Sequence, residues 1–317
     1  MKPIRTIIYT AFVALTCVSV FSSCSHGAAY EYDKGLKLEA QGLSGIEHFK
    51  KSAESGYAEA QFKVGEYYQN REKDLVQAVK WYKKAADQGH AMAQNNLGFC
   101  YSEGLGVEKN YDEAVRLFRL AEEKGAIEAI SNLGTCYADG TGVPQDYAEA
   151  VRRYKIAADQ GSSLAQYNLG VCYMNGYGVQ QDYYEAMQWL RRAADQGLGG
   201  AMNNIGACYL NGWGVPQDYY MAVKWYTKGA ESGDTTSQLT LGYCYENGLG
   251  CQRDYENAVK WYRAAAIQGS PWAATRLGAC YQNAYGVRQD LEEAAKWYKI
   301  AAEQGDEEAI KALESLY

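Results

Sequence analysis

The sequence predicts an all-α fold, a solenoid of stacked helix-turn-helix repeats. The first observation is a Leu-Gly or Ile-Gly pair that returns every 36 residues, a period typical of proteins whose units bury their apolar faces against one another. The second is a helical spacing of apolar residues on both sides of a glycine turn. The pairs are Leu97-Gly98, Leu133-Gly134, Leu169-Gly170, Ile205-Gly206, Leu241-Gly242 and Leu277-Gly278.

The first 23 residues are predicted to be a signal peptide. Lys2 and Arg5 give a basic start, and Thr6 to Phe21 form an apolar stretch too short for a typical membrane span. Ser22-Ser23-Cys24 resembles the lipobox of bacterial lipoproteins, which implies lipidation of Cys24 and a linker over 24–29. An ordinary signal peptidase site at Gly27-Ala28-Ala29 is the alternative.

The first helix of a full repeat is predicted from Ala129, Leu133, Cys136 and Tyr137, which share one face at helical spacing. Gly134 lies inside this helix despite its low helix propensity, so a neighbouring helix is expected to use the space that its missing side chain leaves.

A Gly-x-Gly turn follows each first helix, for example Gly140-Thr-Gly142, because glycine accepts the positive φ that ends a helix. Ala284 replaces the first glycine in the last full repeat and predicts a slightly different turn there. In the first full repeat, residues 69–73 replace the glycine turn.

An acidic or Asn residue precedes each second helix and is predicted to be its N-cap. Glu or Gln three residues later in five repeats predicts a reciprocal capping box. The caps are Asp74, Asn110, Asp146, Asp182, Asp218, Asp254 and Asp290, and the residues three later are Gln77, Glu113, Glu149, Glu185 and Glu293.

Each second helix carries an aromatic pair followed by small residues, as in Trp225-Tyr226 and Trp261-Tyr262. Small residues let helices approach closely, and aromatic rings fill the space between repeats. We therefore interpret the aromatic stripe as core.

These motifs resemble the Sel1-like repeat, a relative of the tetratricopeptide repeat, and the resemblance implies a right-handed α-solenoid. It divides the chain into a degenerate N-terminal repeat at 30–57, seven repeats over 58–305 and a C-terminal capping helix at 306–317. The seven repeats are 58–90, 91–126, 127–162, 163–198, 199–234, 235–270 and 271–305.

Six of the nine cysteines occupy one repeat column. Equivalent helices of stacked repeats lie too far apart for a disulfide, so we expect small buried apolar residues, with Cys251 as a free thiol. Ligands spaced 36 residues apart do not converge on one ion, so we predict no metal and no cofactor. The column is Cys100, Cys136, Cys172, Cys208, Cys244 and Cys280.

The net charge of −7 argues against nucleic acid as the partner, since a polyanion binder needs a basic stripe. Acidic side chains are expected to form solvated outer faces.

The predicted site lies on the concave face, which in related superhelices is lined by the first helices. Asn96, Asn132, Asn168 and Asn204 precede the Leu-Gly or Ile-Gly pair, and Arg276 takes this position in the last repeat. In related tetratricopeptide domains, such residues hold the backbone or carboxylate of a peptide, and an amide offers both donor and acceptor. A ladder of Asn side chains bonded between neighbouring helices is the alternative reading.

The resemblance carries a rival function, since some cysteine-rich Sel1-like proteins are described as penicillin-binding proteins or β-lactamases. No Ser-x-x-Lys motif occurs in the chain, which argues against that enzyme. We therefore predict a non-catalytic scaffold, held at the cell envelope and most simply at the outer membrane by its lipid anchor. Its partner is an unknown peptide or protein, and a secreted or periplasmic chain is the alternative.

Overall fold

A computed structural model describes residues 27–316, which fold as helices and turns without a β-strand. The predicted signal peptide and Cys24 lie outside these residues. The chain divides into two compact units, Met1–Arg153 and Tyr154–Tyr317, with the boundary inside one helix, α8 (Tyr147–Asp159).

The first unit begins with a helix over residues 27–40. The helices that follow it are α2 (Ile46–Glu54), α3 (Ala58–Tyr67), the π-helix η1 (Tyr68–Glu72), α4 (Leu75–Asp87), α5 (Ala91–Glu103), α6 (Tyr111–Glu122) and α7 (Ile127–Asp139). Residues 27–29 are thus helical and not part of a linker. Burial explains this difference, because Ala28 is buried and its carbonyl accepts a hydrogen bond from the Ser52 hydroxyl at 2.6 Å.

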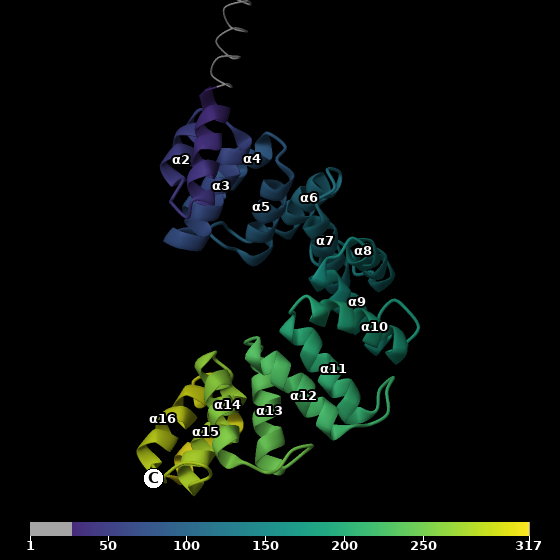
Figure 1. The fold of residues 1–317 in the computed structure, drawn as a ribbon, viewed down its shortest axis with the longest axis vertical. Coiled ribbons are helices and arrows are strands. Elements are labelled where there is room, and N and C mark those ends of the chain that lie inside the picture. The colour runs from purple at the N-terminus through teal and green to yellow at the C-terminus, as the bar shows by residue number, and fades with distance from the viewer. Residues whose placement is uncertain (1–26, 317) are drawn as a thin grey trace, which may run out of the picture. The chain divides into compact units, whose positions relative to one another are not determined.

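The second unit continues with α9 (Ser163–Asn175), α10 (Tyr183–Asp195), α11 (Gly199–Asn211), α12 (Tyr219–Glu231), α13 (Thr235–Asn247), α14 (Tyr255–Ile267), α15 (Pro271–Asn283), α16 (Leu291–Ala302) and α17 (Glu307–Ser315). Each helix packs on the next, as α13 to α16 show in Figure 1. The all-α solenoid of helix pairs is confirmed.

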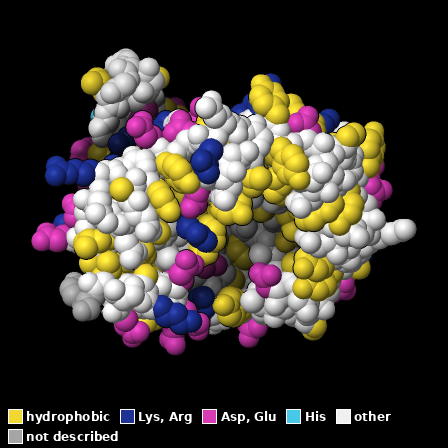
Figure 2. Space-filling view, turned by 90° about the horizontal axis from the view of Figure 1, so that it is seen from below, with side chains coloured by type: hydrophobic (Ala, Val, Ile, Leu, Met, Phe, Trp, Pro, Cys, Tyr) yellow, Lys and Arg dark blue, Asp and Glu magenta, His cyan; other side chains and the backbone are white. Residues whose placement is uncertain are grey.

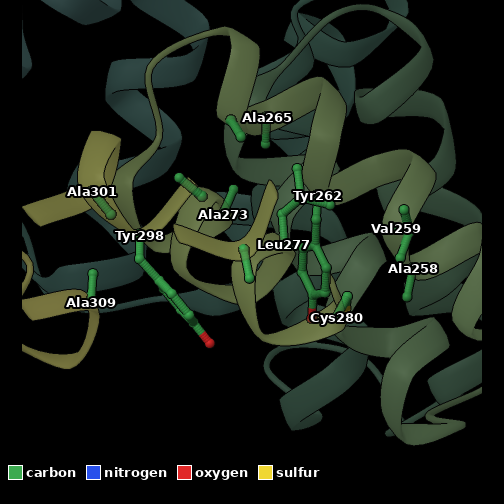
Figure 3. Packing of buried hydrophobic residues seen from close by; sticks show 13 residues of the cluster. Ala258, Val259, Tyr262, Ala265, Ala273, Leu277, Cys280, Tyr298, Ala301 and Ala309 are labelled. Carbon is green, nitrogen blue, oxygen red and sulfur yellow. The ribbon is translucent and has the colours of Figure 1, made fainter. Parts of the chain in front are cut away.

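The glycines inside the first helices make room for a side chain of the second helix. A Cβ on Gly242 would lie 2.7 Å from the ring of Tyr262, and one on Gly206 would lie 2.6 Å from that of Tyr226. Tyr262 is fully buried in a cluster with Leu277 and Cys280 (Figure 3). The prediction that a neighbouring helix needs this space is confirmed at these positions.

All seven predicted N-caps accept a hydrogen bond from the backbone of their helix, as Asp290 does from the N–H of Glu293 at 2.9 Å. The reciprocal half of the capping box is wrong. The N–H of Asp290 donates to the carbonyl of Tyr281, so it is already satisfied, and the Glu293 carboxylate pairs with Lys296 and Trp297 instead.

The turn at Ala284 is the same as the glycine turns, which corrects our expectation. Ala284 adopts φ +58° and donates its N–H to the carbonyl of Cys280, just as Gly248 at φ +69° does to Cys244. In the first full repeat, η1 takes the place of the glycine turn, and Lys73 adopts the left-handed conformation after it.

The predicted cysteine column is confirmed as buried and free, and Cys251 is a half-buried free thiol. Burial raises the pKa of Cys100, Cys172 and Cys208 to about 11 and that of Cys244 to about 12. These thiols are therefore protonated at neutral pH.

Candidate peptide-binding face

The predicted Asn column lies on the first helices, one residue before a buried Leu or Ile. Asn96 and Asn132 belong to the first unit, and Asn168, Asn204 and Arg276 belong to the second. All five side chains are half-buried, because the following residue points into the core and turns its neighbour towards the surface. Each residue thus presents part of its polar group to solvent.

In the first unit, Asn132 and Asn96 belong to a ladder between two first helices. The Nδ2 of Asn132 on α7 donates to the Oδ1 of Asn95 on α5 at 2.9 Å, and the Nδ2 of Asn95 donates to the Oδ1 of Asn96 at 3.2 Å. The middle residue, Asn95, is buried and lies one position before the predicted column, where the residue type varies between repeats. The alternative reading of the column therefore describes these two asparagines.

A small cavity of about 160 Å³ lies beside this ladder. Asn132 and Thr135 of α7 line it together with Phe99 of α5 and Tyr111 of α6. The ring of Phe99 is 43% exposed, which gives the cavity an apolar wall. The volume suits one side chain of a ligand rather than a folded partner.

In the second unit, the side chains of Asn168 on α9 and Asn204 on α11 form no hydrogen bond with any described residue, so their amide groups are available to a ligand. Thr240, which follows in the column, donates to the carbonyl of Thr236 at 2.9 Å and is thereby occupied. Beside Asn204, the Oδ1 of Asn203 is buried without a partner among the described residues.

Arg276 on α15 lies at the far end of this column. Its guanidinium carbon lies 4.6 Å from the ring centroid of Trp272, and its Nε is buried with no acceptor in the described part of the chain. The ring of Tyr243 on α13 approaches Trp272 to 6.5 Å. Trp272 and Tyr243 are 38% and 40% exposed, so the cation lies beside an accessible aromatic pair.

Buried groups below Arg276 are already satisfied. The hydroxyl of Tyr262 donates to Glu246 at 2.5 Å, and that of Tyr298 donates to Gln282 at 2.7 Å. Burial and the bond to Glu246 raise the pKa of Tyr262, so this phenol stays neutral. The guanidinium of Arg276 is thus the group on this helix that can hold an anion.

No set of three or more His, Cys, Asp or Glu residues in the described chain is arranged to hold a metal ion. The described histidines have other partners: His90 caps α5 through the N–H of Ala93, and His48 pairs with Glu31 at 2.6 Å. Among residues 27–316, no helix combines the length and apolar character needed to cross a bilayer.

Another cavity, of about 690 Å³, lies in the first unit away from the predicted column. It is lined by Leu43, Phe49 of α2, Lys63 and Tyr67 of α3, and Arg71 of η1. Lys63 is paired with Glu66 at 3.2 Å, so the wall is of mixed charge. Exposed apolar side chains are also dispersed elsewhere, with charged ones between them on the face in Figure 2.

Comparison with known proteins identifies the repeat. The model of the Sel1 repeat matches residues 23–57, 58–90, 91–125, 127–162, 163–198, 200–234, 236–270 and 273–306. None of the curated proteins matches the chain.

Two solved structures are similar over most of the chain. A Sel1 repeat protein from Oxalobacter formigenes is 30% identical over 94% of this chain and 86% of that one, with a TM-score of 0.70. A protective antigen of uropathogenic Escherichia coli strains is 38% identical over 86% of this chain, with a TM-score of 0.66, and this chain spans 59% of its length. An immunity protein from Pseudomonas aeruginosa, 20% identical over 66% of this chain and 81% of that one with a TM-score of 0.50, shares the fold alone.

Proposed function

The chain belongs to the Sel1 repeat family, and from that premise we propose that it is a non-catalytic scaffold that binds an extended peptide on its first helices. Sel1 repeat proteins commonly serve as protein-interaction scaffolds. The face lined by the first helices is the one that the sequence predicts to be concave.

One observation carries this proposal: the pairing of Arg276 with Trp272. The guanidinium has a buried Nε without an acceptor and stacks on an exposed ring, so a ligand carboxylate would gain a charged hydrogen bond and an apolar contact together. Asn168 and Asn204 lie on the first helices of the same unit. Their unpartnered amides suit the alternating N–H and C=O groups of an extended main chain.

The binding role is thus assigned to the second unit, while Asn96 and Asn132 remain in the ladder of the first. The expected ligand is a peptide with a C-terminal or side-chain carboxylate. The proposal also includes attachment of the chain to the cell envelope through a lipid on Cys24. This part rests on the lipobox-like motif alone.

Binding can be tested with a library of fluorescent peptides that end in a free carboxylate, measured by anisotropy against the full chain. For a peptide that binds, Arg276→Gln should weaken binding about 10- to 100-fold, since a hydrogen bond to a charged group contributes about 1.5–3 kcal/mol. Amidation of the peptide terminus should weaken it similarly. Asn168→Ala with Asn204→Ala should weaken it about 5- to 30-fold.

The matched control is Asn175→Ala with Asn211→Ala, which removes amides from the same two helices. These asparagines are exposed and donate to Val171 and Ala207 of their own helices, so binding should stay unchanged. Equal loss in both double variants, or a library without any carboxylate-dependent binder, would count against the proposal.

A further inference from the structure

The basic residues of the chain gather on the outer stripe of the second helices. Residues at i, i+4, i+7 and i+8 share one face of a helix, and in α10, α12 and α14 this stripe carries six exposed basic side chains. They are Arg191, Arg192, Lys224, Lys228, Lys260 and Arg263. None of them forms an ion pair with a described residue, although the whole chain has a net charge of −7.

At the position of Lys224 and Lys260, three other second helices neutralise the cation, whereas Lys80 of α4 has no ion pair with a described residue. In α6, Arg116 pairs with Glu113 three residues earlier, and in α16 Lys296 pairs with Glu293 at 3.0 Å. The second helices α12 and α14 have Met221 and Asn257 in place of that glutamate, which leaves Lys224 and Lys260 without a carboxylate. The lack of an ion pair at Lys224 and Lys260 therefore follows from exchanges at one repeat position.

A second acidic column is broken in the same region. The residue two before the glycine that follows the second helix is Asp or Glu in six repeats, at Asp87, Glu123, Asp159, Asp195, Glu231 and Glu303. In α14 it is Ile267, which is 72% exposed. The remaining acids on the three helices are Glu185, Asp195, Glu231 and Glu256, all close to helix ends.

Exposed tyrosines begin the same stripe. Tyr184 of α10 and Tyr220 of α12 are 63% and 69% exposed. Tyr184 lies two turns before Arg191, and Tyr220 lies one turn before Lys224. Below the cations are half-buried rings: Lys228 lies 4.3 Å from the centroid of Trp225, and Lys260 lies 4.6 Å from that of Trp261. The stripe thus combines cations with amphipathic rings and one exposed aliphatic side chain.

The three stripes form one surface. Trp225 of α12 packs against a buried cluster that includes Met187 and Leu190 of α10, and Trp261 of α14 packs against a cluster of α12 and α13. Adjacent second helices are therefore neighbours, and their basic residues form a two-dimensional array rather than a single line.

We propose that this array, together with Tyr184, Tyr220 and Ile267, docks onto the surface of a bilayer that contains anionic phospholipids. Clustered Lys and Arg side chains bind anionic headgroups, and Tyr and aliphatic side chains enter the interfacial region. A sheet of headgroups matches an array of cations spread over three helices. This surface lies on the second helices and does not depend on the peptide site.

Vesicle flotation with the full chain tests this docking. Binding should be tighter to vesicles with 30% phosphatidylglycerol than to neutral phosphatidylcholine vesicles. In Lys224→Gln with Lys260→Gln, affinity for the anionic vesicles should fall about 30-fold, roughly fivefold for each cation. The N-terminal residues are common to all variants, so they contribute equally to every comparison.

The control is Lys80→Gln with Lys83→Gln, which removes the same charge from exposed positions of α4. It should reduce binding less than threefold. An equal loss in both variants would show a general charge effect and overturn the proposal, as would equal binding to anionic and neutral vesicles.

Tyr220→Ser with Ile267→Ser separates a bilayer from a soluble polyanion. This variant should lose affinity for anionic vesicles at least fivefold while binding of soluble polyphosphate stays unchanged. If vesicle affinity is unaffected and polyphosphate binds as tightly as the vesicles, the surface recognises free polyanions and the bilayer assignment is wrong.

Discussion

Gln268 donates a hydrogen bond through its Nε2 to the Oε1 of Gln238 at 2.8 Å. The same Nε2 donates to the carbonyl of Gly233 in the preceding repeat, and Gln238 donates to the carbonyl of Ala230 there. The pairs Gln88–Gln61 and Gln196–Gln166 repeat this arrangement. Each pair satisfies a buried amide of the first helix and connects two successive repeats.

One buried glutamine lacks this partner. Gln94 is 4% exposed, and its Oε1 has no hydrogen bond to a described residue because Lys124 occupies the position of Gln268. Lys124→Gln should supply the missing donor and raise the free energy of unfolding by about 1 kcal/mol in urea denaturation. In a Gln94→Ala background the same change should give no gain. A gain of equal size there would mean that removal of the lysine charge is responsible.

Gly206→Ala should destabilise the chain by about 1–3 kcal/mol, because the new methyl group would meet the ring of Tyr226 in a packed core. Gly200→Ala is the control in the same helix. A Cβ there lies 3.5 Å from the ring of Tyr167, an ordinary contact, so stability should stay the same or rise slightly. Thermal denaturation monitored by circular dichroism measures both, and an unaltered midpoint for Gly206→Ala would contradict the packing argument.

Ala284→Gly should stabilise the chain by about 1 kcal/mol, since an L-residue at φ +58° carries a steric cost that glycine avoids. The reverse exchange, Gly248→Ala, should cost a similar amount at the equivalent turn. Urea denaturation of both variants gives the comparison. If both exchanges shift stability in the same direction, the left-handed conformation does not decide the outcome.

Stability should fall as pH rises above about 9. Burial raises the pKa of Cys208 to about 11 and of Cys244 to about 12, so above the ordinary thiol pKa the unfolded chain releases protons that the native chain retains. The contribution is therefore complete below about pH 9 and is lost as pH rises through the native values. Urea denaturation at pH 8, 9 and 10 measures the decline.

In the variant Cys208→Ala with Cys244→Ala, the free energy of unfolding should decline less steeply with pH. The variant lacks two of the thiols that lose their protons in the unfolded chain and keep them in the native chain. Peptide mapping after brief alkylation at pH 8 gives an independent readout, with Cys251 labelled ahead of the buried column. Labelling of Cys208 and Cys251 at equal rates in the native chain would contradict the assigned burial.

The sequence predicts those features that depend on local chemistry within one repeat. The N-caps, the buried thiols and the space at Gly206 follow from residue type and helical spacing. The turn at Ala284 was not foreseen because the surrounding hydrogen bonds, and not the residue itself, determine its φ. The partner of Asn132 was missed for another reason: Asn95 lies on a different helix, and only the register between helices brings the two together.

The net charge of the chain was the least reliable guide to its binding surfaces. A net value of −7 argues against polyanion binding, yet it averages over faces that differ in sign. Lys224 and Lys260 become visible only when each repeat position is compared separately and the missing glutamate is noticed. The outer stripe could have been found in the sequence by that comparison.

The two adjacent aromatic residues of a second helix pack against different parts of the solenoid. Tyr226 closes its own helix pair against Gly206, whereas Trp225 reaches the core next to the preceding second helix. Loss of the tyrosine thus weakens one repeat, while loss of the tryptophan weakens the coupling between repeats. A chain pulled from its ends would then separate first at the junction between α10 and α12 when Trp225 is replaced, in two steps instead of one cooperative rupture.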